Sequence, residues 1–79
     1  MLGHEVVKQQ FHVLANELSV RFPELDLRFN LQSGTNRLRL KAASVSHEVI
    51  ELPLGEYETD ELLYAAMFRI KEIARLYDD

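Results

Sequence analysis

Three histidines are the residues of this sequence that suggest metal chemistry most directly. The segment His47-Glu48-Val49-Ile50-Glu51 resembles part of a zinc-protease motif, but that motif needs two histidines one turn apart on a helix. Here the second position is Glu51, and the segment is predicted to be a strand. His4 and His12 lie two turns apart in a predicted helix, where a solvated or hydrogen-bonded histidine is the simpler interpretation. We therefore expect no metal site.

Serine chemistry is no better supported. Ser46 and His47 are neighbours on the predicted strand, so their side chains should point to opposite faces and cannot act as nucleophile and base. The three glycines form no Gly-x-Ser-x-Gly elbow, phosphate-binding loop or dinucleotide fingerprint. Carboxylates are abundant, but no pattern indicates that one is buried and shifted in pKa. We expect no enzyme and no cofactor.

Composition indicates one small domain spanning residues 1–79. The chain has 47% hydrophobic and 28% charged residues, no cysteine and a net charge of −4. The absence of cysteine excludes a disulfide framework and a thiolate metal site. The longest apolar run, residues 62–68, is far shorter than the roughly 20 residues of a membrane span, and the first residues lack the features of a signal peptide. We expect a soluble cytoplasmic protein.

The elements that must position any site follow from the hydrophobic periods. Residues 2–21 predict a helix, because apolar side chains recur at steps of three and four until Pro23: Val7, Phe11, Leu14, Leu18 and Phe22. Residues 25–32 and 37–42 alternate apolar and polar side chains around a turn at Gly34, which predicts a hairpin with its leucines on one face.

A third strand is predicted over residues 45–52, with two alternatives for its facing. The favoured one turns Val45, His47 and Val49 inward, with a bulge later in the strand, and the other buries Ile50 and Leu52. A second helix is predicted from Asp60 to about Tyr77, with Thr59 as its N-cap. Its apolar stripe contains Leu63, Ala66, Met67, Ile70, Ile73, Ala74 and Tyr77.

The predicted fold class is α+β, in the order helix–three-stranded antiparallel sheet–helix (αβββα), with both helices packed on one sheet face. This order resembles that of the double-stranded-RNA-binding domain, at nearly this length. Those domains begin the second helix with a lysine cluster that grips phosphates, whereas residues 56–61 here read Glu-Tyr-Glu-Thr-Asp-Glu. The resemblance therefore implies an architecture and argues against that function, because carboxylates repel a phosphate backbone.

Charge is segregated along the chain, and two surfaces follow from it. Residues 28–41 contain four basic and no acidic side chains, and we call these the basic face of the sheet: Arg28, Arg37, Arg39 and Lys41. The simpler interpretation is a solvated strand pair, with Glu48 opposite Arg39 neutralising part of it. Residues 48–61 contain six acidic and no basic side chains. Four of them form what we call the acidic connection: Glu56, Glu58, Asp60 and Glu61.

Apolar side chains outside the expected core indicate contact surfaces on both helices. On the second helix, what we call the aromatic–basic row lies opposite the apolar stripe: Tyr64, Phe68, Lys71 and Arg75. The alternative is that Phe68 is simply part of the core. On the first helix, Leu2, Val6, Val13 and Val20 form a second stripe. Val6, Val13 and Val20 are seven residues apart, a spacing that favours a weak seam for a partner helix or a homodimer.

The leading hypothesis is a small non-enzymatic domain that works by protein–protein contact, as a regulator, inhibitor or adaptor, through the aromatic–basic row. Either helix could also support a homodimer. The alternative is binding of nucleic acid or the ribosome through the basic face. A second alternative is that the acidic connection mimics nucleic acid and occupies a basic site on a target protein. No membrane association is expected, and the partner is not identified by any motif.

Overall fold

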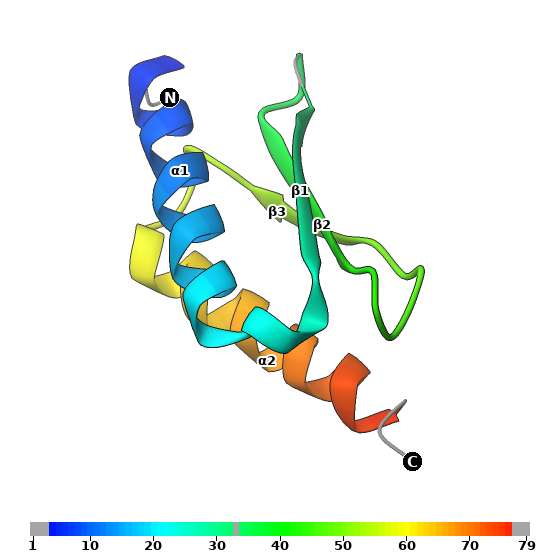
Figure 1. Cartoon of the computed structure of the whole chain (residues 1–79). Helices are drawn as coiled ribbons and strands as arrows, with labels where there is room; N and C mark the ends of the chain where they lie inside the picture. The colour runs from blue at the N-terminus through cyan, green and yellow to red at the C-terminus, as the bar shows by residue number, and fades with distance from the viewer. Residues whose placement is uncertain (1–3, 33, 77–79) are drawn as a thin grey trace.

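Two helices cover one face of a three-stranded antiparallel sheet (Figure 1). The computed structural model describes residues 4–32 and 34–76. The elements follow in the order α1 (His4–Arg21), a short 3-10 turn η1 (Pro23–Leu25), β1 (Leu27–Gln32), β2 (Arg37–Ala42), β3 (Ile50–Pro53) and α2 (Thr59–Leu76). The predicted αβββα order and the α+β class are confirmed.

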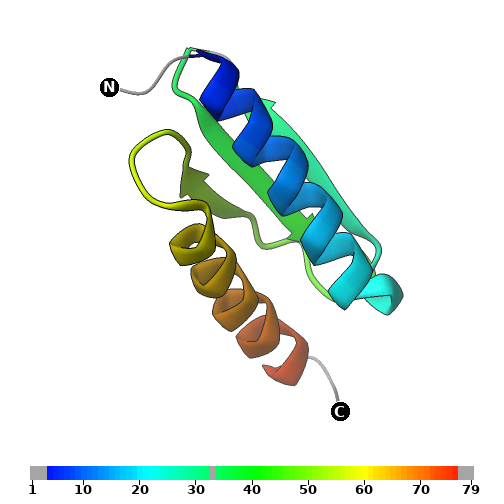
Figure 2. The same ribbon diagram turned by 90° about the vertical axis from the view of Figure 1, so that its left-hand side faces the viewer.

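The predicted apolar stripe of the first helix is buried in the core, and the helix ends at Arg21, two residues before Pro23. Val7, Leu14 and Leu18 are buried, and Phe11 and Phe22 pack against them. The Phe22 amide still donates to the Leu18 carbonyl at 3.0 Å, after which Pro23 opens η1. In Figure 2 the two helices lie side by side over the sheet and run in nearly the same direction.

The hairpin of β1 and β2 has the predicted facing. Leu27 lies opposite Ala42, Phe29 opposite Leu40 and Leu31 opposite Leu38, so that the apolar side chains share the inner face. The turn between the strands needs left-handed backbone, which Gly34 adopts at φ 89° and Asn36 at φ 53°. The strand order is β1-β2-β3, with β2 in the centre.

The favoured facing of the third strand was wrong, and so were its bounds. The strand begins only at Ile50, and Ile50 and Leu52 are buried opposite Leu40 and Leu38, while Val49 is exposed. Val45 only packs at the edge of the core, and His47 is exposed.

Local hydrogen bonds explain why residues 43–49 do not join the sheet. The Ser46 amide donates to the Ala42 carbonyl at 2.9 Å, and the Ser46 hydroxyl accepts a bond of 3.0 Å from the Glu48 amide. These bonds hold residues 43–45 in a turn and give residues 46–48 local partners that compete with strand pairing. Strand pairing with β2 begins at Ile50, where Ile50 and Leu52 can both be buried.

A buried amide side chain ties the connection between β3 and α2 to the first helix. Gln10 is only 5% exposed. Its Nε2 donates to the Tyr57 carbonyl at 2.9 Å and to the Thr59 hydroxyl at 3.3 Å, and its Oε1 accepts a bond of 2.8 Å from the Gly55 amide. The helix itself begins one residue before the predicted start, at Thr59, with the Leu62 amide donating to the Glu58 carbonyl.

Replacing Gln10 should therefore destabilise the domain. Gln10→Ala leaves the Gly55 amide and the Tyr57 carbonyl without their partner, and we expect the free energy of unfolding to fall by about 1–3 kcal/mol. Urea denaturation followed by circular dichroism measures it. The exposed neighbour Gln9 is the control, and Gln9→Ala should change the unfolding free energy by less than about 0.5 kcal/mol. Equal effects of the two variants would contradict the role of Gln10.

Candidate functional site

The aromatic–basic row lies on the outer side of α2, away from the sheet. Tyr64 is 69% exposed and Phe68 is 65% exposed, and Lys71 and Arg75 are exposed as well. At 100° per residue the four positions fall within about 60° of arc, so the structure brings them together as the sequence predicted. The alternative that Phe68 belongs to the core is wrong.

The opposite side of α2 explains why the row must face outward. Its buried side chains anchor the helix on the sheet and on α1, and they are Leu62, Leu63, Ala66, Ile70 and Ile73. Met67 and Ala74 pack at the margin of this stripe, as predicted, and Tyr77 lies outside the described residues. Since the core fixes the rotation of the helix, both aromatic rings are left in solvent.

The two cations of the row have no ionic partner within residues 4–32 and 34–76. Arg69, on a different side of the helix, lies 3.8 Å from the Glu72 carboxylate, whereas no such pair involves Lys71 or Arg75. Their position in the last turns of α2 suits the negative end of the helix dipole. As far as the described residues go, both cations are open to an acidic group of another molecule.

The basic face also assembles on one surface, the outer side of the sheet. A shallow depression of about 210 Å³ opens there, lined by Arg28, Phe29, Asn30, Arg39, Leu40, Lys41 and Val49. Arg37 lies beyond this depression, at the start of β2. Three of the four predicted side chains therefore share one hollow.

Carboxylates already engage most of this basic face. Glu51 Oε2 lies 3.3 Å from Arg39 Nε, and Glu51 Oε1 lies 3.9 Å from Arg37 Nη1. The predicted pairing of Glu48 with Arg39 was wrong, because β3 begins at Ile50 and its register places Glu51 opposite Arg39. Among the described residues, Arg39 Nε has no partner with hydrogen-bond geometry, so this contact is mainly electrostatic.

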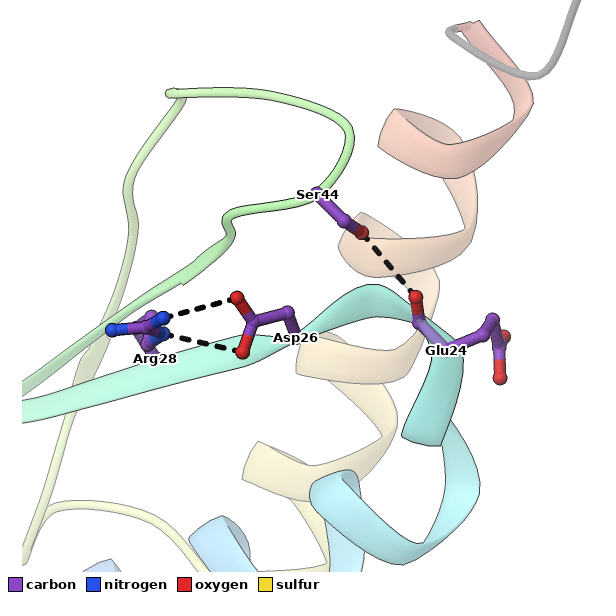
Figure 3. Close-up of polar contacts among 4 residues, drawn as sticks. All are labelled: Glu24, Asp26, Arg28 and Ser44. Carbon is purple, nitrogen blue, oxygen red and sulfur yellow. Dashed lines mark hydrogen bonds and ion pairs between the residues drawn. The ribbon is translucent and has the colours of Figure 1, made fainter.

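Arg28 is held by the turn that precedes its own strand (Figure 3). Its Nε and Nη2 donate to the two carboxylate oxygens of Asp26, at 3.2 and 3.1 Å. This hydrogen bonding, helped by the charge of Asp26, raises the pKa of Arg28 above its ordinary value. The same figure shows the Ser44 hydroxyl donating to the Glu24 carbonyl, at 3.4 Å, which fastens residues 43–49 to η1.

The acidic connection is grouped at the start of α2, and its four carboxylates are exposed. Three of them, Glu56, Glu58 and Glu61, line a second shallow depression of about 490 Å³. Val6 and Gln10 of α1 line it as well, together with Tyr57 and Thr59. The Gln10 bonds hold the backbone of this segment, while its charged groups point to solvent. Tyr57 adds an exposed aromatic ring among the acids.

The valine stripe of α1 forms a sparser surface. Val20 is 69% exposed and Val13 is half-exposed, but Val6 is partly buried and Leu2 lies outside the described residues. The exposed residues between these two valines, Asn16 and Ser19, are polar. This row contains no aromatic side chain, unlike the aromatic–basic row.

The histidines considered as metal ligands do not form a site among the described residues. His12 is exposed with its ring against the edge of Phe11, at a centroid distance of 5.7 Å, and His47 is exposed on the turn after β2. The side chain of His4 lies outside the described residues. Within residues 4–32 and 34–76, no three His, Asp or Glu side chains converge to hold a metal ion.

Comparison with known proteins adds no relative. No family model matches the chain, and no curated protein or solved structure matches it. In the described parts of the chain, neither helix is long and apolar enough to cross a bilayer. The function must be inferred from the surfaces of the molecule.

Gln10 is the residue near these surfaces that the sequence interpretation missed. It lies three residues after Val7 and four before Leu14, which is the spacing of a core position. A polar residue at such a position is a signal for a buried hydrogen-bonded amide, because an unpaired amide in the core would be costly.

The contact between Arg39 and Glu51 should contribute little to stability. Both side chains are about two-fifths exposed, so a double-mutant cycle with Arg39→Met and Glu51→Met should give a coupling free energy of only about 0.2–1 kcal/mol. Urea denaturation measures it, and the coupling should shrink at about 1 M salt. A coupling above about 2 kcal/mol would mean that Glu51 is essential to the sheet and does more than balance its charge.

Proposed function

We propose that this protein is a small non-enzymatic domain, a regulator, inhibitor or adaptor of the cytoplasm, that works by protein–protein contact through the aromatic–basic row of α2. The observation that carries the proposal is the exposure of Tyr64 and Phe68, one turn apart, on a helix whose other side is fully used by the core. A few residues contribute most of the binding energy at protein interfaces, and tyrosine and arginine are enriched among them.

The pairing of rings and cations supports a protein partner. Tyr64 and Phe68 offer apolar area with few rotatable bonds, so little side-chain entropy is lost when they are covered. Lys71 and Arg75 lie beside them and have no ionic partner in the part of the chain that the structure describes. A partner that covers the rings and brings carboxylates to the cations would satisfy both features.

The basic face is ranked second for an electrostatic reason. Affinity for nucleic acid comes mostly from cations that neutralise phosphates. Here Arg28 is bound to Asp26, and Arg37 and Arg39 share Glu51. Each would have to exchange a carboxylate for a phosphate, so we expect weaker binding there than the four charges alone predict.

Phe68→Asp tests the proposal. Because Phe68 is in solvent, the variant should keep the circular-dichroism spectrum of the wild type and its unfolding free energy to within about 0.5 kcal/mol. Proteins recovered from host extract with the immobilised wild-type chain should be lost with the variant. Quantitative mass spectrometry of the recovered proteins measures this loss.

The matched control is Val20→Asp, which places the same charge on an equally exposed apolar site of α1. Partners should be retained by this control. Loss of the same partners with Val20→Asp but not with Phe68→Asp would move the contact to α1. If Phe68→Asp unfolds the chain, the assignment of Phe68 to the surface is wrong.

A further inference from the structure

The outer side of α2 carries acidic, aromatic and basic side chains in a fixed order. Asp60 begins the row, Tyr64 and Phe68 follow at steps of four, and Lys71 and Arg75 follow at steps of three and four. This spacing keeps the five side chains on one side of the helix, and all five are exposed. The buried residues of α2, which pack toward α1 and β3, lie on the opposite side of the helix.

Resting on the proposed function, we infer that the partner of this row is a second copy of the chain, docked with its α2 antiparallel around a twofold axis beside Phe68. An antiparallel pair centred there places Asp60 of one copy opposite Arg75 of the other. Tyr64 then lies opposite Lys71 of the second copy, and the two Phe68 side chains meet at the axis. Twofold symmetry makes every such contact occur twice, which is the usual design of homodimers.

Charge complementarity selects this arrangement. Acidic groups occupy the first turn of the row and cations the last two turns, so antiparallel pairing brings opposite charges together at both ends. A parallel pair would place Asp60 against Asp60 and Arg75 against Arg75. The row is therefore complementary to itself in one orientation only.

Within residues 4–32 and 34–76, no carboxylate compensates the basic end of the row. Lys71 and Arg75 are four residues apart on the same side, a like-charge spacing that is unfavourable in a single helix. No ion pair with another described residue offsets this repulsion, because Glu72 contacts Arg69. The acidic first turn of a second copy, Asp60 with Glu61 beside it, provides the missing carboxylates.

The aromatic side chains supply the apolar part of the contact. Two Phe68 rings at the axis can stack, and each Tyr64 ring can receive the ammonium group of Lys71 from the other copy. Covering the two rings removes from water the largest side chains that α2 exposes in its middle turns. The axis thus lies where apolar area is greatest.

The size of the surface predicts a weak dimer. α2 has 18 residues and is about 27 Å long, so a single helix pair buries less than the roughly 1,200 Å² typical of stable complexes. We expect a dissociation constant in the range of about 10–100 μM at low salt, rising as salt screens the end contacts.

Sedimentation velocity with the full chain tests the inference. The wild type should pass from monomer to dimer between about 5 and 500 μM. The pair Lys71→Glu and Arg75→Glu should weaken the dimer at least about tenfold, because both ends become acidic. The pair Asp60→Lys and Glu61→Lys should weaken it similarly, because both ends become basic.

The decisive experiment mixes the two double variants, Lys71→Glu with Arg75→Glu and Asp60→Lys with Glu61→Lys. Each variant repels its own copy, but an acidic chain and a basic chain attract at both ends, so the mixture should form heterodimers as tightly as the wild type to within about threefold. A chain with all four reversals should dimerise again by itself. Circular dichroism checks that each variant is folded, and Phe68→Asp, which leaves both helix ends intact, gives a second loss of dimer if a charge variant unfolds.

Two results would overturn the inference. One is a wild type that stays monomeric at about 500 μM, and the other is a mixture no tighter than its components. If the wild type is monomeric while capture of another protein still depends on Phe68, the proposed contact surface stands and only its occupant is different. If neither dimer nor Phe68-dependent capture is found, both proposals fail.

Discussion

The buried amide of Gln10 fixes how the second half of the chain is attached to the first. Its three hydrogen bonds, between 2.8 and 3.3 Å, join α1 to Gly55, Tyr57 and Thr59. They hold the segment that leads into α2 against the buried side of α1. The outward direction of Tyr64 and Phe68 follows from the buried apolar stripe of α2, and the Gln10 bonds fix the chain that enters this helix.

The second helix carries two patterns that do not conflict. Small and aliphatic side chains on one side complete the core with β3 and α1, as Ala66 and Ile70 illustrate by being fully buried. Acidic residues at its start and basic residues at its end favour the helix dipole. The same polarity makes the outer row complementary to an inverted copy, so one arrangement of charge serves both folding and contact.

Much of the fold was predictable because its elements are periodic. The stripe of α1, the facing of Leu38 and Leu40, and the exposure of Phe68 all follow from a period of 3.6 or 2. The third strand was not predictable in this way, because the Ser46 hydroxyl and the bonds to Ala42 override the alternation after residue 42. The partner of Arg39 could not be assigned without that register.

The candidate surfaces also differ in whether the sequence alone could predict them. The wheel of α2 sufficed to place Tyr64 and Phe68 outward, since a regular helix needs no tertiary information. The state of the basic face depends on contacts across strands and turns, where Glu51 and Asp26 engage its arginines. Only the structure reveals that the three arginines of the basic face, unlike the two cations of α2, have carboxylate partners among the described residues.

The most direct test of self-association through the aromatic–basic row is a series of two-dimensional amide NMR spectra recorded from low micromolar to millimolar concentration of the full chain. The account predicts concentration-dependent shifts along the outer side of α2, largest near Phe68 and near residues 60 and 75, with β1, β2 and the Val13–Val20 side of α1 unchanged. Shifts confined to the sheet or to α1, or spectra that do not change with concentration, would contradict it.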